Sequence, residues 1–174
     1  MFKKQWPAFL LAFVLPIVAV FWWWGGFATV TVSEAVAEPT RFAYLDYEGP
    51  ISNLRKAQRA ALEKFTAAKT EAGDTLSVIL VDPRSHQGKT RAQVGYGLAE
   101  GVPLPAGLKE GSIAKRPVLR ARVQAAVLLA PSKAYQALAD QRGGEAAIRM
   151  PAVERYRPAG QADRVGVFTL EVDR

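Results

Sequence analysis

A long uncharged segment near the amino terminus constrains the fold of this chain more than any other feature. Between Lys4 and Glu34 the sequence carries no charged residue, and all four tryptophans lie in this segment. A helix of roughly 17–25 apolar residues can span the hydrocarbon core of a bilayer, and tryptophan favours the membrane–water interface. The segment therefore predicts a single transmembrane helix over about residues 7–24, within an anchor formed by residues 1–26.

A cleaved secretory signal peptide is the alternative interpretation, because Ala35-Val36-Ala37 has the small-x-small form of a cleavage site. The apolar run is longer than the roughly 7–15 residues that a signal peptide needs, which favours an uncleaved anchor. Lys3 and Lys4 favour a cytoplasmic amino terminus. We therefore expect a single-pass membrane protein with residues 27–174 on the outer side of the membrane, the periplasmic side in a bacterium.

The composition of residues 27–174 excludes several classes of function. All 16 acidic residues lie there, and so do all basic residues except Lys3 and Lys4, which precede the predicted transmembrane helix. The positive excess is spread out, without the basic stripe and interleaved aromatic residues of a nucleic-acid-binding protein. The chain has no cysteine, and His86 is its only histidine. We therefore predict no nucleic-acid partner, no metal site and no cofactor.

A regular order of strands and helices is predicted after the anchor. Apolar residues recur at steps of three and four over about residues 51–70, which predicts an amphipathic helix. Ser132, after Pro131, is expected to cap a second helix that ends at Gly143-Gly144. A connector rich in glycine and proline spans residues 101–111. Extended runs predict strands at residues 27–32, 41–47, 76–81, 91–98, 118–129, 146–156 and 165–172.

Each half of the predicted domain thus has the order strand, helix, strand, strand. Two such βαββ modules would form an antiparallel sheet with two helices on one face. Neither half has enough apolar surface to fold alone, so we expect one shared core. The predicted fold class is α+β, as a single domain of residues 27–174 that follows one transmembrane helix.

Four segments, taken in series, resemble the GyrI-like effector-binding family, whose members are built on the SHS2 module. They are the strand-to-helix junction Tyr44–Pro50, the strand end Val81-Asp82-Pro83, the strand Val94–Gly97 and the strand Ala152–Tyr156. The resemblance implies two βαββ modules related by pseudo-twofold symmetry, with a ligand groove where they meet. It also implies a small-molecule-binding role, since several members sense lipophilic and often cationic compounds. Other members bind protein partners, and some are anchored in a membrane.

Glu154 is the main candidate for ligand binding, because it matches the Glu-x-Tyr position that the resemblance assigns to the groove. A carboxylate in an apolar cleft is costly unless something offsets its charge, and a cationic ligand would do so. Tyr156 should lie on the same face as Glu154, because side chains alternate along a strand. Tyr44 and Tyr96 are predicted as flat walls for an apolar or aromatic ligand.

Three functions remain open at this point. The first is a membrane-tethered, non-catalytic binding module for a small amphipathic or cationic molecule, which makes an enzyme the less favoured class. The second is a hydrolase of strained-ring compounds, with Glu154 polarising or deprotonating water. The third is a protein-interaction adaptor held at a membrane, with a protein partner in place of the small molecule.

Overall fold

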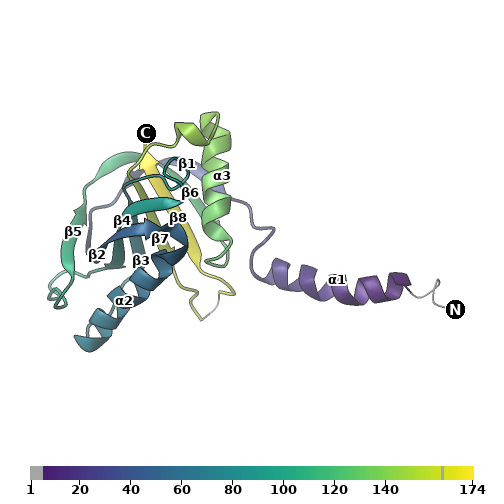
Figure 1. The fold of residues 1–174 in the computed structure, drawn as a ribbon, viewed down its shortest axis with the longest axis horizontal. Coiled ribbons are helices and arrows are strands. Elements are labelled where there is room, and N and C mark those ends of the chain that lie inside the picture. The colour runs from purple at the N-terminus through teal and green to yellow at the C-terminus, as the bar shows by residue number, and fades with distance from the viewer. Residues whose placement is uncertain (1–5, 162) are drawn as a thin grey trace.

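The computed structural model describes residues 6–161 and 163–174, and its central feature is a curled antiparallel sheet (Figure 1). Within these residues the sheet has eight strands, in the order β1-β6-β8-β7-β3-β4-β2-β5. The strands are β1 (Thr31–Ala37), β2 (Thr40–Pro50), β3 (Thr75–Ile79), β4 (Lys89–Gly97), β5 (Lys109–Ile113), β6 (Arg116–Gln124), β7 (Ala152–Arg157) and β8 (Val167–Asp173). The helices are α1 (Trp6–Trp23), α2 (Leu54–Ala67) and α3 (Ala130–Arg142), with short 3-10 turns η2 (Ile51–Asn53) and η3 (Glu145–Ala147).

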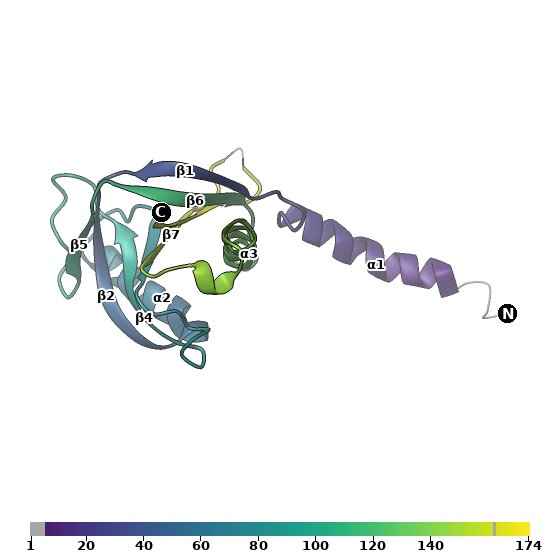
Figure 2. The ribbon, with the colours of Figure 1, turned by 90° about the horizontal axis from the view of Figure 1, so that it is seen from above.

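The α+β class and the antiparallel sheet are confirmed. In chain order, β2-α2-β3-β4 and β6-α3-β7-β8 each run strand, helix, strand, strand, and they meet where β3 pairs with β7. Figure 2 shows the sheet curling from β1 and β6 round to β2 and β5. The pseudo-twofold relation between the halves stays a prediction. The junction of β3 with β7 places the two halves side by side at the centre of the sheet.

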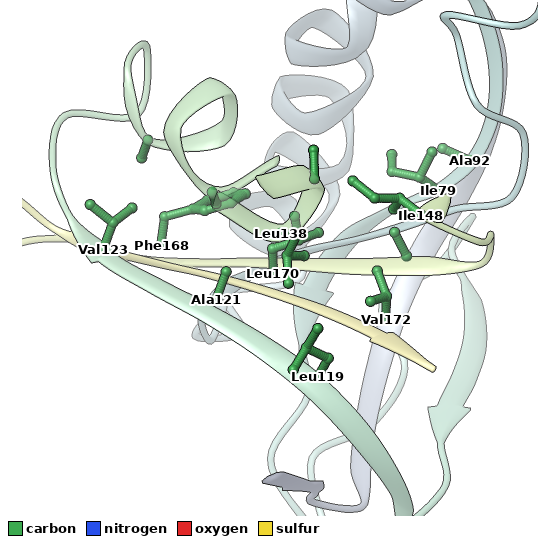
Figure 3. Packing of buried hydrophobic residues seen from close by; sticks show 14 of the residues in the cluster. Ile79, Ala92, Leu119, Ala121, Val123, Leu138, Ile148, Phe168, Leu170 and Val172 are labelled. Atoms are coloured by element: carbon green, nitrogen blue, oxygen red, sulfur yellow. The ribbon is translucent and has the colours of Figure 1, made fainter. Parts of the chain in front are cut away.

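Helices α2 and α3 cover the same face of the sheet. Leu54 of α2 and Leu138 of α3 belong to one buried cluster, to which β6 and β8 also contribute. Figure 3 shows Leu138 over Leu170 of β8, with Val172 further along the same strand, and all three are fully buried. The opposite face carries a smaller cluster around Phe42. The two helices therefore share one core, as the pattern of apolar residues predicted.

Several boundaries differ from the prediction. The first strand begins at Thr31, after a turn at residues 24–27, and the strand β5 forms inside the predicted connector. The Ser132 hydroxyl donates to the Leu129 carbonyl at 2.9 Å, and α3 already begins at Ala130, so Ser132 is not the helix cap. Gly143 ends α3 as expected, because its positive φ of 81° suits a residue without a β-carbon.

The predicted transmembrane helix is wrong. Helix α1 contains 18 residues, and it extends away from the sheet in Figure 1. At about 1.5 Å per residue it measures roughly 27 Å, about two residues short of the roughly 20 that a typical 30 Å hydrocarbon core needs. Within the described residues, no helix has both the length and the apolar character needed to cross a membrane. The expected single-pass topology, outer-side location and membrane tether are withdrawn. Lys3 and Lys4 lie outside the described residues, and the boundary at residue 26 stays a prediction.

The end of α1 is held against the domain by aromatic contacts. The Arg164 guanidinium, in the segment between β7 and β8, lies 4.5 Å from the ring centroid of Trp22 and 5.5 Å from that of Trp23. Phe21 and Phe27 pack edge to face at 5.2 Å. A cation over an indole ring contributes about 0.5–1 kcal/mol at an exposed site. The Arg164 contacts connect the end of α1 to the segment between β7 and β8.

Candidate functional site

A cavity of about 590 Å³ opens on the helix-covered face, where β3 and β7 meet. Its floor is formed by β3 and β7, and its walls come from the first turns of α2 and α3, the segment after β3, and η3. The lining is mainly apolar, with a few polar groups. Cavities of roughly 300–1,000 Å³ with this character are typical of small-molecule sites. The place where the two halves of the domain pair is therefore also the place with room for a ligand.

Glu154 lies on the floor of this cavity. It sits in β7 directly opposite Ser77 of β3, and its partly exposed side chain borders the open space. Removal from bulk water raises the pKa of its carboxyl group to about 7, although a hydrogen bond from Tyr135 works in the opposite direction. Among the described residues, no basic side chain forms an ion pair with Glu154. Its negative charge is therefore only partly compensated.

Tyr135 of α3 connects this carboxylate to the wall of the cavity. Its hydroxyl donates a hydrogen bond of 2.9 Å to Oε1 of Glu154. Burial, together with the charge of Glu154, raises the pKa of the Tyr135 hydroxyl well above its ordinary value. The phenol thus stays protonated and can act as a donor at any physiological pH. Local sequence patterns do not predict this contact, because Tyr135 lies on α3 and Glu154 on β7.

The mouth of the cavity carries a cluster of charges. Arg84 pairs with Asp82 at 2.9 Å and with Glu145 at 3.2 Å, and its guanidinium lies 5.4 Å from the ring centroid of Tyr135. Burial alone would raise the pKa of Asp82, but the hydrogen bonds from Arg84 outweigh it and hold that pKa below its usual value. The Arg84 amide also donates to the Asp82 carboxylate, as expected for a turn-forming aspartate.

Exposed apolar side chains surround the same mouth. Ile51, Val127 and Leu128 line the cavity and are 40%, 45% and 57% exposed. Val127 and Leu128 were predicted to continue a strand, but they lie in the turn between β6 and α3. A strand there would have buried alternate side chains, whereas the turn presents both at the opening. The entrance to the cavity therefore carries both exposed apolar side chains and charged side chains.

The four predicted site residues separate into two groups. Glu154 and Tyr156 both line the cavity, from neighbouring positions on one face of β7. Tyr96 lies outside the lining and packs edge to face against Phe65 of α2 at 5.8 Å. Tyr44 packs against Phe42 on the opposite face of the sheet. A ligand-binding role for any of the four stays a prediction.

No metal centre is found in the part of the chain that the structure describes. No three acidic or histidine side chains gather there in an arrangement that could hold a metal ion. His86 instead makes a local contact, with Nδ1 2.8 Å from the hydroxyl of Ser85.

Comparison with solved structures identifies the fold. The C-terminal domain of EcmrR superposes with a TM-score of 0.59 at 8% identity, over 83% of this chain and 96% of that one. SAV2435 bound to tetraphenylphosphonium superposes with a TM-score of 0.57 at 10% identity, over 82% and 92%. A Vibrio cholerae integron cassette protein gives 0.54 at 8%, over 84% and 97%.

The chain has the fold of the GyrI-like effector-binding domains. At 8–10% identity this likeness describes the fold and not the activity. No protein-family model and no curated protein matches the sequence. The evidence for a function of this chain therefore lies in its own side chains.

Proposed function

We propose that this protein is a non-catalytic binding module for a small lipophilic cation, with Glu154 as the group that recognises the positive charge. The observation that carries the proposal is a carboxylate on the floor of a largely apolar cavity, without a basic partner among the described residues. Partial desolvation makes the ionised carboxylate costly, and an organic cation placed beside it would recover that energy. A cation with apolar substituents would also fill the rest of the space.

The walls of the cavity support the same class of ligand. Tyr156 and Tyr135 offer aromatic surface near the carboxylate, and Ile51, Val127 and Leu128 offer exposed apolar surface at the mouth. Aromatic faces attract cations by about 0.5–2 kcal/mol, more where water is excluded. The site lies where the two βαββ halves meet, which is where a pseudo-twofold arrangement would place a ligand groove. Tyr44 and Tyr96 have no part in this proposal.

One of the structural neighbours suggests a suitable probe. SAV2435 is described as bound to tetraphenylphosphonium, a permanent monocation with four aromatic rings. Its charge does not change with pH, so any pH dependence of binding belongs to the protein. The same compound can therefore test whether this cavity accepts a lipophilic cation.

The test is a calorimetric titration of the full chain with tetraphenylphosphonium at pH 8, where Glu154 is ionised. Glu154→Gln should weaken binding by at least about tenfold, since two unit charges about 5 Å apart attract each other by about 3 kcal/mol at an effective dielectric constant of about 20. Glu63→Gln removes an exposed carboxylate of α2 outside the cavity and should change little. Neutral triphenylphosphine oxide should bind wild type and Glu154→Gln alike. Equal phosphonium affinity in wild type and Glu154→Gln would refute the role of Glu154.

A hydrolase of strained-ring compounds is the second candidate. The observation that favours it is the pKa of about 7 for Glu154, because a general base works best near the ambient pH. Wild type should then turn over a reactive cyclopropane substrate, and Glu154→Gln should lose that turnover. If wild type bound the phosphonium but showed no turnover, the hydrolase would be excluded and the binding module would be the function that stands.

A further inference from the structure

The mouth of the cavity already holds a cation, the guanidinium of Arg84. This group lies over the ring of Tyr135 and is paired with the carboxylates of Asp82 and Glu145. Its contact with Asp82 is bidentate, with Nε 2.9 Å from Oδ1 and Nη2 2.9 Å from Oδ2. An aromatic face flanked by carboxylates is the environment that binding sites use for organic cations. Here a side chain of the protein itself occupies that environment.

Tyr135 lies between this outer position and the floor of the cavity. Its hydroxyl donates to Glu154, while its ring faces Arg84. Asp82, Arg84, Glu145 and Glu154 all line the same cavity. The cavity therefore has two anionic positions, and only the inner one, at Glu154, is open to a ligand.

We propose that Arg84 determines charge specificity by filling an outer cation subsite, so that the cavity accepts singly charged lipophilic cations and rejects dications. This inference rests on the proposed function of Glu154. A monocation places its charge at Glu154 and packs its apolar part beside the aliphatic stem of Arg84. The second charge of an elongated dication meets the Arg84 guanidinium, which already covers the Tyr135 ring and holds the Asp82 carboxylate in a bidentate pair. Removing that guanidinium frees Asp82, Glu145 and the Tyr135 ring for a second charge.

The test compares decyltrimethylammonium with decamethonium, which share the ten-carbon chain and differ by one quaternary ammonium group. Arg84→Met removes the charge and keeps an unbranched apolar side chain. We expect decamethonium to bind this variant at least about tenfold more tightly than wild type, equivalent to about 1.4 kcal/mol. Decyltrimethylammonium should change by no more than about threefold, the size of a general electrostatic effect.

Arg55→Met is the matched control. Arg55 lines the cavity from α2 and is exposed, so its loss removes an equal charge from the lining while Arg84 keeps its partners. Because an exposed charge acts weakly on either probe, this variant should tighten the binding of decamethonium and of decyltrimethylammonium by less than about threefold each. Adding Asp82→Asn and Glu145→Gln to Arg84→Met should abolish the gain for decamethonium. A thermal unfolding scan of each variant checks that the fold is kept.

The outcomes separate this inference from the proposed function. A gain confined to decamethonium in Arg84→Met, and lost again in the triple variant, supports the inference. Equal changes for both probes, or a gain of the same size in Arg55→Met, overturn it while binding at Glu154 stands. A wild-type protein that binds no monocation overturns the proposed function and this inference together.

Discussion

The affinity for a permanent cation should fall as the pH falls, because the cation is bound by the ionised form of Glu154. Burial raises the pKa of this carboxyl group from 4.5 to about 7. A bound cation stabilises the ionised form and lowers the pKa in the complex. Binding therefore releases a proton wherever the free protein is protonated, and affinity must decline below the pKa of the free protein. Asp82 stays ionised throughout this range, because its pKa is held below its usual value.

The size of the effect follows from the fraction of Glu154 that is ionised. With a pKa of about 7, roughly half of the molecules carry the charge at pH 7, about a tenth at pH 6 and about a hundredth at pH 5. Because the ionised form binds much more tightly, the apparent Kd for tetraphenylphosphonium should rise by about fivefold from pH 7 to pH 6, and by up to about tenfold per unit below that, until it reaches the Kd of Glu154→Gln. Above about pH 8 the Kd should be constant. An ordinary glutamate, with a pKa near 4.3, would give a flat profile over this whole range.

Isothermal titration calorimetry measures both consequences. Titrations at half-unit steps from pH 5 to pH 8.5 give the profile of Kd. Titrations at pH 7 in buffers of different ionisation enthalpy give the number of protons released, which should be about one half. Glu154→Gln has no proton to release, so its weaker binding should not vary with pH. A flat wild-type profile, or a profile shared by Glu154→Gln, would refute the reasoning.

Three further predictions concern stability and the position of α1. The pKa of Glu154 is higher in the folded protein than in the unfolded chain, so the free energy of unfolding of wild type should fall by up to about 3 kcal/mol as the pH rises from about 4.5 to 7. Glu154→Gln should remove this fall, which urea unfolding at pH 5 and pH 8 measures. Leu138→Ala should lower the free energy of unfolding by about 2–5 kcal/mol, because the Leu138 side chain is fully buried. Leu62 is 41% exposed, so Leu62→Ala should change the free energy of unfolding by less than about 0.5 kcal/mol. Arg164→Met should increase acrylamide quenching of tryptophan fluorescence, because it removes the guanidinium from Trp22 and Trp23; unchanged quenching would show that the contact does not hold the end of α1.

Local sequence patterns predicted the elements whose residues repeat regularly. The apolar spacing found the helix that contains Phe65, and Gly143 marked the end of α3. The strand β5 was missed because its run Lys-Glu-Gly-Ser-Ile has no apolar alternation. Its pairing with β2 depends instead on Gly111, where a β-carbon would meet the ring of Phe42 at 2.7 Å. A contact of that kind is a property of the assembled sheet and leaves no periodic signal.

The site likewise combines residues that follow a local sequence pattern with residues that only the assembled fold brings together. Alternation along β7 sufficed to place Glu154 and Tyr156 on one face. The partners Tyr135 and Glu145 come from the consecutive elements α3 and η3, whereas Arg84 comes from the segment after β3, far from them in the sequence. Each alone resembles an ordinary surface or packing residue. Only the docking of α3 and η3 beside β3 and β7 brings these side chains together.

Locating a bound cation tests the central claim most directly. Tetraphenylarsonium has the shape and charge of tetraphenylphosphonium, and its arsenic atom gives an anomalous signal that marks the centre of charge. In crystals of the full chain grown with this compound at pH 8, the arsenic peak should lie in the cavity beside the carboxylate of Glu154. The ring of Tyr135 or Tyr156 should be within about 6 Å of it. An arsenic peak elsewhere on the protein, with the cavity around Glu154 free of the cation, would contradict the account.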